Sequence, residues 1–162
     1  MKIAITGHSA GIGQALAKIY SEQGHEVVGL SRRNGYNIRS VPKVAGIIES
    51  CDVFINNAQV GFAQTELFWE VWNRWQGQEK TIINISTQMT NNSLAPKEEW
   101  DQYIIQKKAL ELAHTQCQER SSLPKLILIK PGSIATQPSQ RPPEYQDVDE
   151  YAQQTVEYIN GQ

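Results

Sequence analysis

The sequence predicts a doubly wound α/β fold, in which a parallel sheet of about six strands carries helices on both faces. Two observations support this prediction. Short apolar runs alternate with segments of helical periodicity along most of the 162 residues. The first run, Lys2–Thr6, leads through a glycine-rich turn into a helix that starts near Gln14. We expect one domain that spans residues 1–162.

The turn after the first strand holds Gly7, Gly11 and Gly13. Gly7 would let the chain leave the strand tightly, Gly11 would admit a pyrophosphate close to the backbone, and Gly13 would let the helix pack close to the sheet. Free N–H groups at the start of the helix, with the helix dipole, favour a phosphate. The alternative is a glycine-rich turn that binds nothing.

The spacing Thr6-Gly7-x-x-x-Gly11-Ile12-Gly13 resembles the amino-terminal motif of the short-chain dehydrogenase/reductase family. Four further motifs, in the family's order, extend the resemblance over roughly residues 1–159. The resemblance implies a nicotinamide dinucleotide as cofactor, with Ser9 and Ile12 among its contacts.

The second predicted strand ends at Ser31, and Arg32 and Arg33 follow it directly. At this place in a dinucleotide-binding fold an acidic residue would bind the ribose 2′-hydroxyl, whereas an arginine accommodates a 2′-phosphate. Because no Asp or Glu ends this strand and guanidinium groups suit phosphate, the sequence predicts NADP(H) rather than NAD(H). Ser31 would add a hydroxyl contact. The alternative is a solvated basic turn.

Asn37 and Ile38 follow the turn at residues 34–35 and could form only a very short strand over residues 36–38. They stand where the family places an acidic residue and an apolar residue beside the adenine. The resemblance therefore implies an adenine contact, with an amide in place of the carboxylate. Ser40 is expected to cap the next helix.

The apolar run Val53–Ile55 predicts a buried parallel strand. It ends in Asn56-Asn57-Ala58-Gln59, which resembles the family's N-N-A-G motif under the cofactor. The resemblance implies cofactor contacts for Asn57 and Ala58. Gln59 replaces the usual glycine, and its side chain either crowds the nicotinamide ribose or points away.

Thr65 is expected to cap a helix over residues 66–75 that has one apolar side. The resemblance implies that this helix and a second one over residues 98–119 form a dimer interface, so we expect a homo-oligomer. The family's catalytic asparagine has no clear match. Asn73 is the only asparagine on the first of these helices, and it lies too close in sequence to the next motif.

The predicted strand 81–87 resembles the family's I-V-N-I-S-S motif, whose second serine is catalytic. Thr87 takes that position, and Ser86 is the alternative if the register is shifted. The following helix carries Tyr103-x-x-x-Lys107, the family's Y-x-x-x-K motif. Residues four apart share a helix face, so the Lys107 ammonium is expected beside the phenol and should lower the pKa of Tyr103. The resemblance also implies that Lys107 binds the nicotinamide ribose.

The predicted strand 125–130 ends in Pro131-Gly132-Ser133-Ile134-Ala135-Thr136, which resembles the family's P-G-x-x-x-T motif. The resemblance implies that Pro131, Gly132, Ile134 and Thr136 line the nicotinamide end of the cofactor site. A polar loop over residues 137–146 and a last helix over residues 148–159 follow. The family has a longer substrate-covering segment and a seventh strand, so we expect a minimal or truncated member.

Composition argues against several classes of protein. The net charge of −2 and the pI of about 5.9 give no basic footprint for nucleic acid. Cys51 and Cys117 show neither metal-ligand nor disulfide spacing, so no metal site is expected. No apolar run approaches the ~18 residues of a membrane-spanning helix, and the sequence enters a strand without a signal-peptide pattern. We expect a cytoplasmic protein without nucleic-acid or membrane partners.

The motifs and the family resemblance together predict an NADPH-dependent carbonyl reductase that also runs as an alcohol dehydrogenase on a small substrate. Thr87 would hold the carbonyl oxygen, Tyr103 would donate the proton, and Lys107 would orient the ribose and hold Tyr103 in its acidic form. The alternative is a catalytically weak or inactive NADP(H)-binding sensor of the same fold. Gln59 and Thr87 favour that alternative, and the intact Tyr103–Lys107 pair argues against it. A structural protein that binds no cofactor fits the combined motifs poorly.

Overall fold

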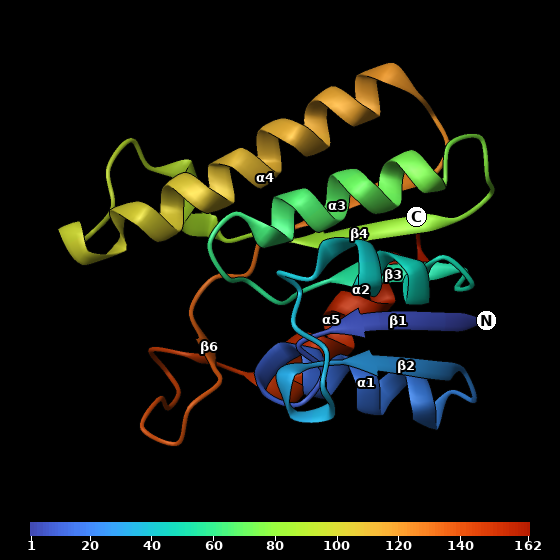
Figure 1. Ribbon diagram of the computed structural model, residues 1–162. Helices are drawn as coiled ribbons and strands as arrows, with labels where there is room; N and C mark the ends of the chain where they lie inside the picture. The colour runs from blue at the N-terminus through green and yellow to red at the C-terminus, as the bar shows by residue number, and fades with distance from the viewer.

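The computed structural model describes all 162 residues and shows a three-layer α/β arrangement (Figure 1). Five parallel strands form the central sheet in the order β2-β1-β3-β4-β5. Their bounds are β1 Lys2–Thr6, β2 Glu26–Leu30, β3 Val53–Asn56, β4 Thr81–Ile85 and β5 Lys125–Ile129. The predicted fold class is therefore confirmed, with five strands in the sheet in place of about six.

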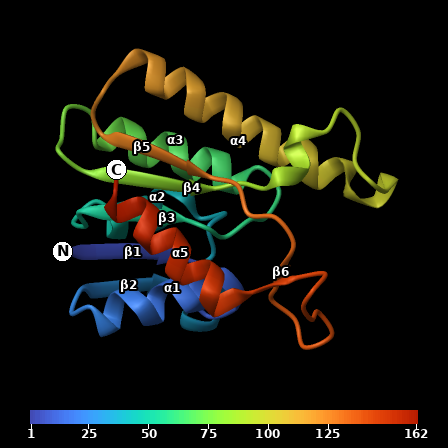
Figure 2. The same cartoon turned by 180° about the vertical axis from the view of Figure 1, so that it is seen from behind.

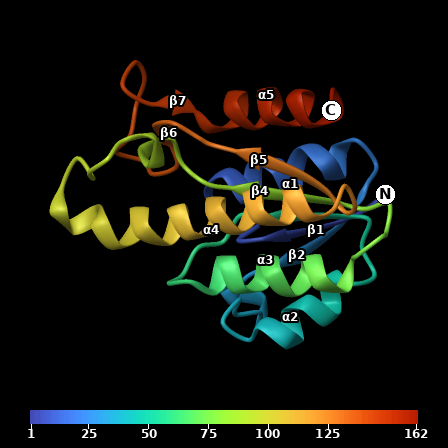
Figure 3. The ribbon, with the colours of Figure 1, turned by 90° about the horizontal axis from the view of Figure 1, so that it is seen from above.

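The helices divide between the two faces of the sheet. Figures 2 and 3 show α1 and α5 together on one face and the other three long helices on the opposite face. The bounds are α1 Gly11–Glu22, α2 Val41–Ile48, α3 Ala63–Arg74, α4 Asp101–Arg120 and α5 Val148–Asn160. Short elements complete the chain: the 3-10 turns η1 Arg32–Asn34, η2 Gln88–Asn91 and η3 Glu98–Trp100, and the paired strands β6 Ile134–Ala135 and β7 Gln146–Asp147.

The strand predicted over residues 36–38 does not form. Gly35, at φ +87°, ends η1, and α2 begins at Val41. Too few residues lie between these points for the chain to run along β2 and return. The segment contributes packing instead, because the Ile38 side chain is buried in the core beneath α2.

Two apolar layers hold the sheet, one on each face. The α2–α3–α4 layer is built around Phe54, Phe68 and Trp75, and the α1–α5 layer around Leu16 and Val156. Both faces of the strands are thus covered, which explains why the middle residues of the strands are mostly apolar and do not alternate with polar residues. The carboxyl ends of the strands, which carry the polar residues, are therefore fixed against a rigid support.

Two side chains that were expected to cap helices make no capping hydrogen bond. The helix expected after Thr65 begins at Ala63, so Thr65 lies inside α3, and the N-cap position is Phe62. Ser40 does occupy the N-cap of α2, but its side chain accepts no capping hydrogen bond. None of the helices combines the length and the apolar character needed to span a bilayer.

Candidate active site

The predicted motifs meet at the carboxyl edge of the sheet, which lies at the left in Figure 1. Thr6, at the end of β1, joins the ends of β1 and β3 by hydrogen bonds. Its Oγ1 accepts hydrogen bonds from the backbone N–H groups of Asn57 (3.0 Å) and Ala58 (3.1 Å). The Asn57 amide donates to the Thr6 carbonyl at 3.1 Å. The N-N-A-Q segment is thereby held directly against the glycine turn.

The glycine turn has the geometry that an anion site needs. Gly7 and Gly11 have φ values of +71° and +53°, which only glycine adopts readily. A Cβ on Gly13 would lie 2.4 Å from the Gly7 carbonyl oxygen, so only glycine lets α1 approach β1 this closely. No side chain caps α1 and its first turn holds no acidic residue. The N–H groups that begin α1 are therefore available to a phosphate.

A cleft of about 670 Å³ opens beside this turn, a size within the usual range for ligand sites. It is lined by the glycine turn, the end of β2, the segment after η1 and the end of β3: Gly7, Ser9, Ala10, Leu30, Ser31, Arg32, Arg33, Tyr36, Asn37, Ile38, Arg39, Ala58, Gln59 and Val60. The cleft thus brings together predicted dinucleotide contacts from four separate segments. Four other contacts predicted on these segments are not part of its lining: Gly11, Ile12, Gly13 and Asn57.

The charged side chains that line the cleft are all basic. Arg32, Arg33 and Arg39 line it, and no carboxylate does. Arg33 contacts the glycine turn, where its Nη1 donates a hydrogen bond to the Ser9 carbonyl at 3.4 Å. Arg39 is a residue that the sequence analysis missed, because its place depends on the compact path between η1 and α2. The lining fits a ligand that carries phosphate groups.

Lys107 is buried at the same edge of the sheet, with 3% of its surface exposed. Its Nζ donates to Gln64 Oε1 at 2.9 Å and to the Ile85 carbonyl at 2.8 Å. Burial lowers the pKa of Lys107 to about 8, against the opposing charge of Glu111. Nζ lies 5.7 Å from the centroid of the Tyr103 ring. The ammonium is thus next to the ring while it donates to groups of the protein.

Tyr103 does not have the lowered pKa that the sequence predicts. Burial raises the pKa of Tyr103, and a hydrogen bond with the Thr87 side chain acts in the opposite direction. The prediction fails because the desolvation of the buried phenol outweighs the effects that lower its pKa. The structure does place Thr87 against the phenol, whereas the Ser86 hydroxyl points to Glu111.

Two residues next to this group were missed by the sequence analysis. Gln64 is 2% exposed, donates to the carbonyls of Asn56 (2.8 Å) and Ile85 (3.0 Å), and accepts from Lys107. No sequence signal marks it, since its position depends on the short connection between β3 and α3. Glu111 accepts hydrogen bonds from the ends of β4 and β5 and from η2, and its place one helical turn after Lys107 was a usable signal.

Gln59 points toward α4. Its amide donates to the Gln106 side chain and, at 3.3 Å, to the Gly61 carbonyl. The Gln59 side chain therefore reaches from the end of β3 to the helix that carries Tyr103.

The P-G-x-x-x-T segment lies over the glycine turn. Thr136 Cγ2 is 3.3 Å from the position that a Cβ on Gly11 would occupy. Ile134 is buried, and the Thr136 hydroxyl lies 3.4 Å from the Gln140 side-chain oxygen. Pro131 accepts a hydrogen bond from the Gln88 N–H at 2.9 Å, which joins this segment to the loop after β4.

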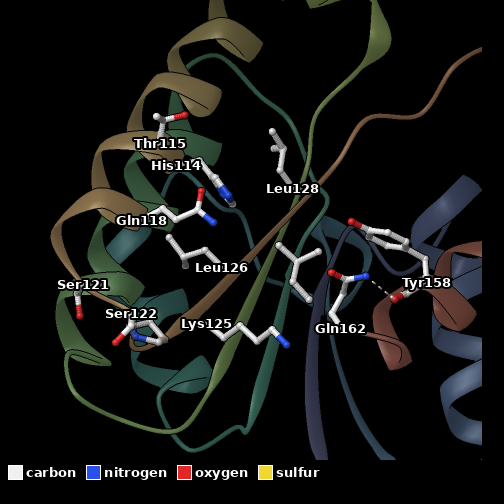
Figure 4. Close-up of a pocket in the computed structure, with 12 residues that line it drawn as sticks. His114, Thr115, Gln118, Ser121, Ser122, Lys125, Leu126, Leu128, Tyr158 and Gln162 are labelled. Carbon is white, nitrogen blue, oxygen red and sulfur yellow. Dashed lines mark hydrogen bonds between the residues drawn. The ribbon is translucent and has the colours of Figure 1, made fainter.

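A second cavity, of about 650 Å³, runs along the outer edge of β5 (Figure 4). Figure 4 shows His114 and Gln118 of α4 on one side and Tyr158 and Gln162 on the other. None of the predicted site residues lines this cavity. No group of three or more His, Cys, Asp or Glu side chains is placed to hold a metal ion.

Comparison with known proteins agrees with this arrangement at the level of the fold. No family model matches the chain. An uncharacterized oxidoreductase of Emericella nidulans, AN7799, is 32% identical over 120 residues, which are 59% of this chain and 43% of that relative. The match therefore spans less than half of the relative's length.

Several solved structures superimpose closely. A short-chain dehydrogenase of Burkholderia cenocepacia in complex with NADP gives a TM-score of 0.82 at 17% identity, covering 99% of this chain and 84% of that one. A ketone-specific alcohol dehydrogenase of Comamonas testosteroni gives 0.75 at 17% identity, covering 98% and 82%. A 4-hydroxyisoleucine dehydrogenase complexed with NADH gives 0.76 at 17% identity, covering 98% and 90%. The resemblance that the motifs predict is confirmed, and the chain has the fold of the short-chain dehydrogenase/reductase family.

Proposed function

We propose that the protein is an NADPH-dependent oxidoreductase that interconverts a small carbonyl compound and its alcohol. The observation that carries the proposal is the group at the edge of the sheet: the Tyr103 phenol, beside the Thr87 side chain and flanked by the buried ammonium of Lys107. A protein that only binds a dinucleotide gains little from a phenol at this place.

The residues present fit the cofactor. The uncapped start of α1 would hold the pyrophosphate, and Arg32, Arg33 and Arg39 suit a 2′-phosphate. Bound NADPH would supply a hydride to the carbonyl carbon of the substrate. The solved relatives include complexes with NADP and with NADH, so our choice of NADPH rests on the arginines of the cleft.

The protein residues would then handle the proton. Because burial raises the pKa of Tyr103, the phenol is neutral at pH 7 and can donate to the substrate oxygen as negative charge develops there. Thr87 would donate a hydrogen bond to the same oxygen. The Lys107 ammonium, which lies 5.7 Å from the centroid of the Tyr103 ring, would stabilise the phenolate left behind by the attraction of opposite charges.

Tyr103→Phe tests this proposal. NADPH consumption is followed with a panel of small aldehydes, ketones and diketones, and NADPH affinity is measured separately. We expect turnover to fall by about 100-fold or more with cofactor affinity unchanged. Tyr158→Phe, on the exposed face of α5, is the matched control. Full turnover in the Tyr103 variant would contradict the assigned role.

A cofactor-binding sensor is the second candidate. The contact between Gln59 and Gln106 favours it, because it links the end of β3 to α4 beside the proposed nicotinamide site. NADPH binding without turnover on any compound of the panel would support the sensor. Gln59→Gly would then be the first variant to assay for restored turnover.

We also propose that the protein forms a homodimer through α3 and α4, which lie side by side in Figure 3. Trp69 of α3 is 46% exposed, and Ile105 and Leu112 of α4 are 57% and 62% exposed. Ile105 and Leu112 are two turns apart and share a helix face. Sedimentation of the wild type and of Leu112→Lys tests this, with Leu94→Lys, an exposed leucine off both helices, as the control.

A further inference from the structure

We propose that Glu111 is a positioning residue, which holds the segment 86–91 that contains Thr87 against the helix that carries Tyr103 and Lys107. The effect on turnover rests on the proposed function, whereas the effect on the segment 86–91 does not.

Glu111 gathers donors from three different elements. The Ser86 hydroxyl, at the end of β4, lies 2.5 Å from Oε1, and the Thr90 hydroxyl of η2 lies 2.6 Å from the same oxygen. The Lys130 ammonium, at the end of β5, donates to Oε2 at 3.1 Å. One carboxylate on α4 thus connects both ends of the segment that holds Thr87, and the strand beside it.

The segment itself transmits this position to Thr87. The Thr90 hydroxyl lies 2.8 Å from the Thr87 carbonyl, so its single proton is shared between Thr87 and Glu111. Lys130 also donates to the Asn91 side chain at 2.6 Å. Apart from bonds within the loop itself, the backbone N–H groups of Ser86 and Gln88 donate to the carbonyls of Ile129 and Pro131, at and after the end of β5. The half-buried Glu111 side chain therefore links this segment to α4, which also carries Tyr103.

The carboxylate is charged and acts on the site electrostatically as well. Burial alone would raise the pKa of Glu111, but hydrogen bonds from Ser86, Thr90 and Lys130 outweigh it and hold the pKa below its ordinary value. The charge of Glu111 in turn raises the pKa of Lys107 against the effect of burial. Removing the charge should therefore move the titration of Lys107 to lower pH.

Glu111→Gln keeps the shape of the side chain and removes the charge. Its amide oxygen can still accept from the two hydroxyls, but its NH₂ group would face the Lys130 ammonium. Because misplacing a catalytic group can cost about 100-fold in rate, we expect kcat to fall about tenfold or more. Glu119→Gln, exposed and two turns further along the same helix, makes the same charge change without these contacts.

The experiment measures kcat, KM and NADPH affinity from pH 6 to pH 9 for the wild type and both variants. We expect Glu111→Gln to lower kcat, to leave NADPH affinity at pH 6 within about threefold, and to shift the alkaline loss of affinity toward lower pH. The pH shift separates positioning from a general loss of stability. Wild-type values for kcat and for the pH profile would overturn the inference.

Hydrogen–deuterium exchange provides a measurement that needs no turnover. We expect faster exchange across residues 86–91 in Glu111→Gln than in the wild type or in Glu119→Gln, and unchanged exchange there would overturn the inference. A wild type that neither binds NADPH nor reduces any carbonyl probe would instead contradict the proposed function. If Glu111→Gln fails to fold, Thr90→Val removes one of the same hydrogen bonds and is held to the same exchange criterion.

Discussion

Replacing Lys107 by methionine should change how the stability of the protein depends on pH. Methionine has a similar length and no charge, so it fills the space under Tyr103 without the buried ammonium. Burial lowers the pKa of Lys107 from 10.5 to about 8, whereas in the unfolded chain a lysine titrates near ~10.4. Between these values the unfolded chain binds more protons than the folded protein, so stability rises with pH in this window.

The size of this effect follows from the two pKa values. From pH 7 to pH 9 the Lys107 titration adds about 1.4 kcal/mol to the free energy of unfolding of the wild type, and Lys107→Met lacks this increment. All other titrating groups, including the buried thiols of Cys51 and Cys117, are common to both proteins and cancel in the difference.

Urea denaturation of both proteins at pH 7 and pH 9, with a reductant present, measures the difference. We expect the stability of the wild type relative to Lys107→Met to increase by about 1.4 kcal/mol between the two pH values. At pH 7 the variant gains from losing a buried charge and loses the donor to Gln64 and Ile85. Equal pH dependence of the two proteins would refute the burial of a titrating ammonium.

Three further predictions concern the turn, the cleft and the outer helices. Gly13→Ala should destabilise by about 1–3 kcal/mol or more, since its Cβ would strike backbone; Gly46→Ala, with no atom nearer than 3.8 Å, should stabilise by about 0.5–1 kcal/mol in the same thermal or urea assay. The double variant Arg32→Ala/Arg33→Ala should weaken NADPH binding about 10- to 100-fold in calorimetry, as expected for lost charge-assisted hydrogen bonds, while NADH binding changes little. Leu112→Lys should shift a concentration-dependent dimer to monomer in sedimentation. A fall in NADH affinity equal to that of NADPH, or a variant dimer as tight as the wild type, would contradict the second and third predictions.

Sequence patterns over a few neighbouring residues predicted the glycine turn and the buried strands correctly. The glycine turn was predicted in detail because Gly7 and Gly13 meet backbone constraints that only glycine satisfies. Uninterrupted apolar runs such as Val53–Ile55 predicted buried parallel strands correctly. The strand at residues 36–38 was wrong because chain length, which hydrophobic pattern does not encode, leaves no room for it between η1 and α2.

The chemical details of the candidate site were harder to predict. The Y-x-x-x-K spacing placed Lys107 beside Tyr103 correctly, but it gave no information about the other acceptors of the ammonium. Those acceptors come from β4 and from the start of α3, which are distant in sequence. Gln64 and Arg39 were missed for the same reason, since only the folded connections bring them to the site.

Calorimetric titration of the wild-type protein with NADPH and with NADH tests the central claim most directly. The uncapped start of α1 and the arginines of the cleft predict that NADPH binds at least about tenfold more tightly than NADH. Equal affinities would contradict the role given to Arg32 and Arg33. Binding of neither nucleotide would contradict the cofactor site itself, and the proposed oxidoreductase function with it.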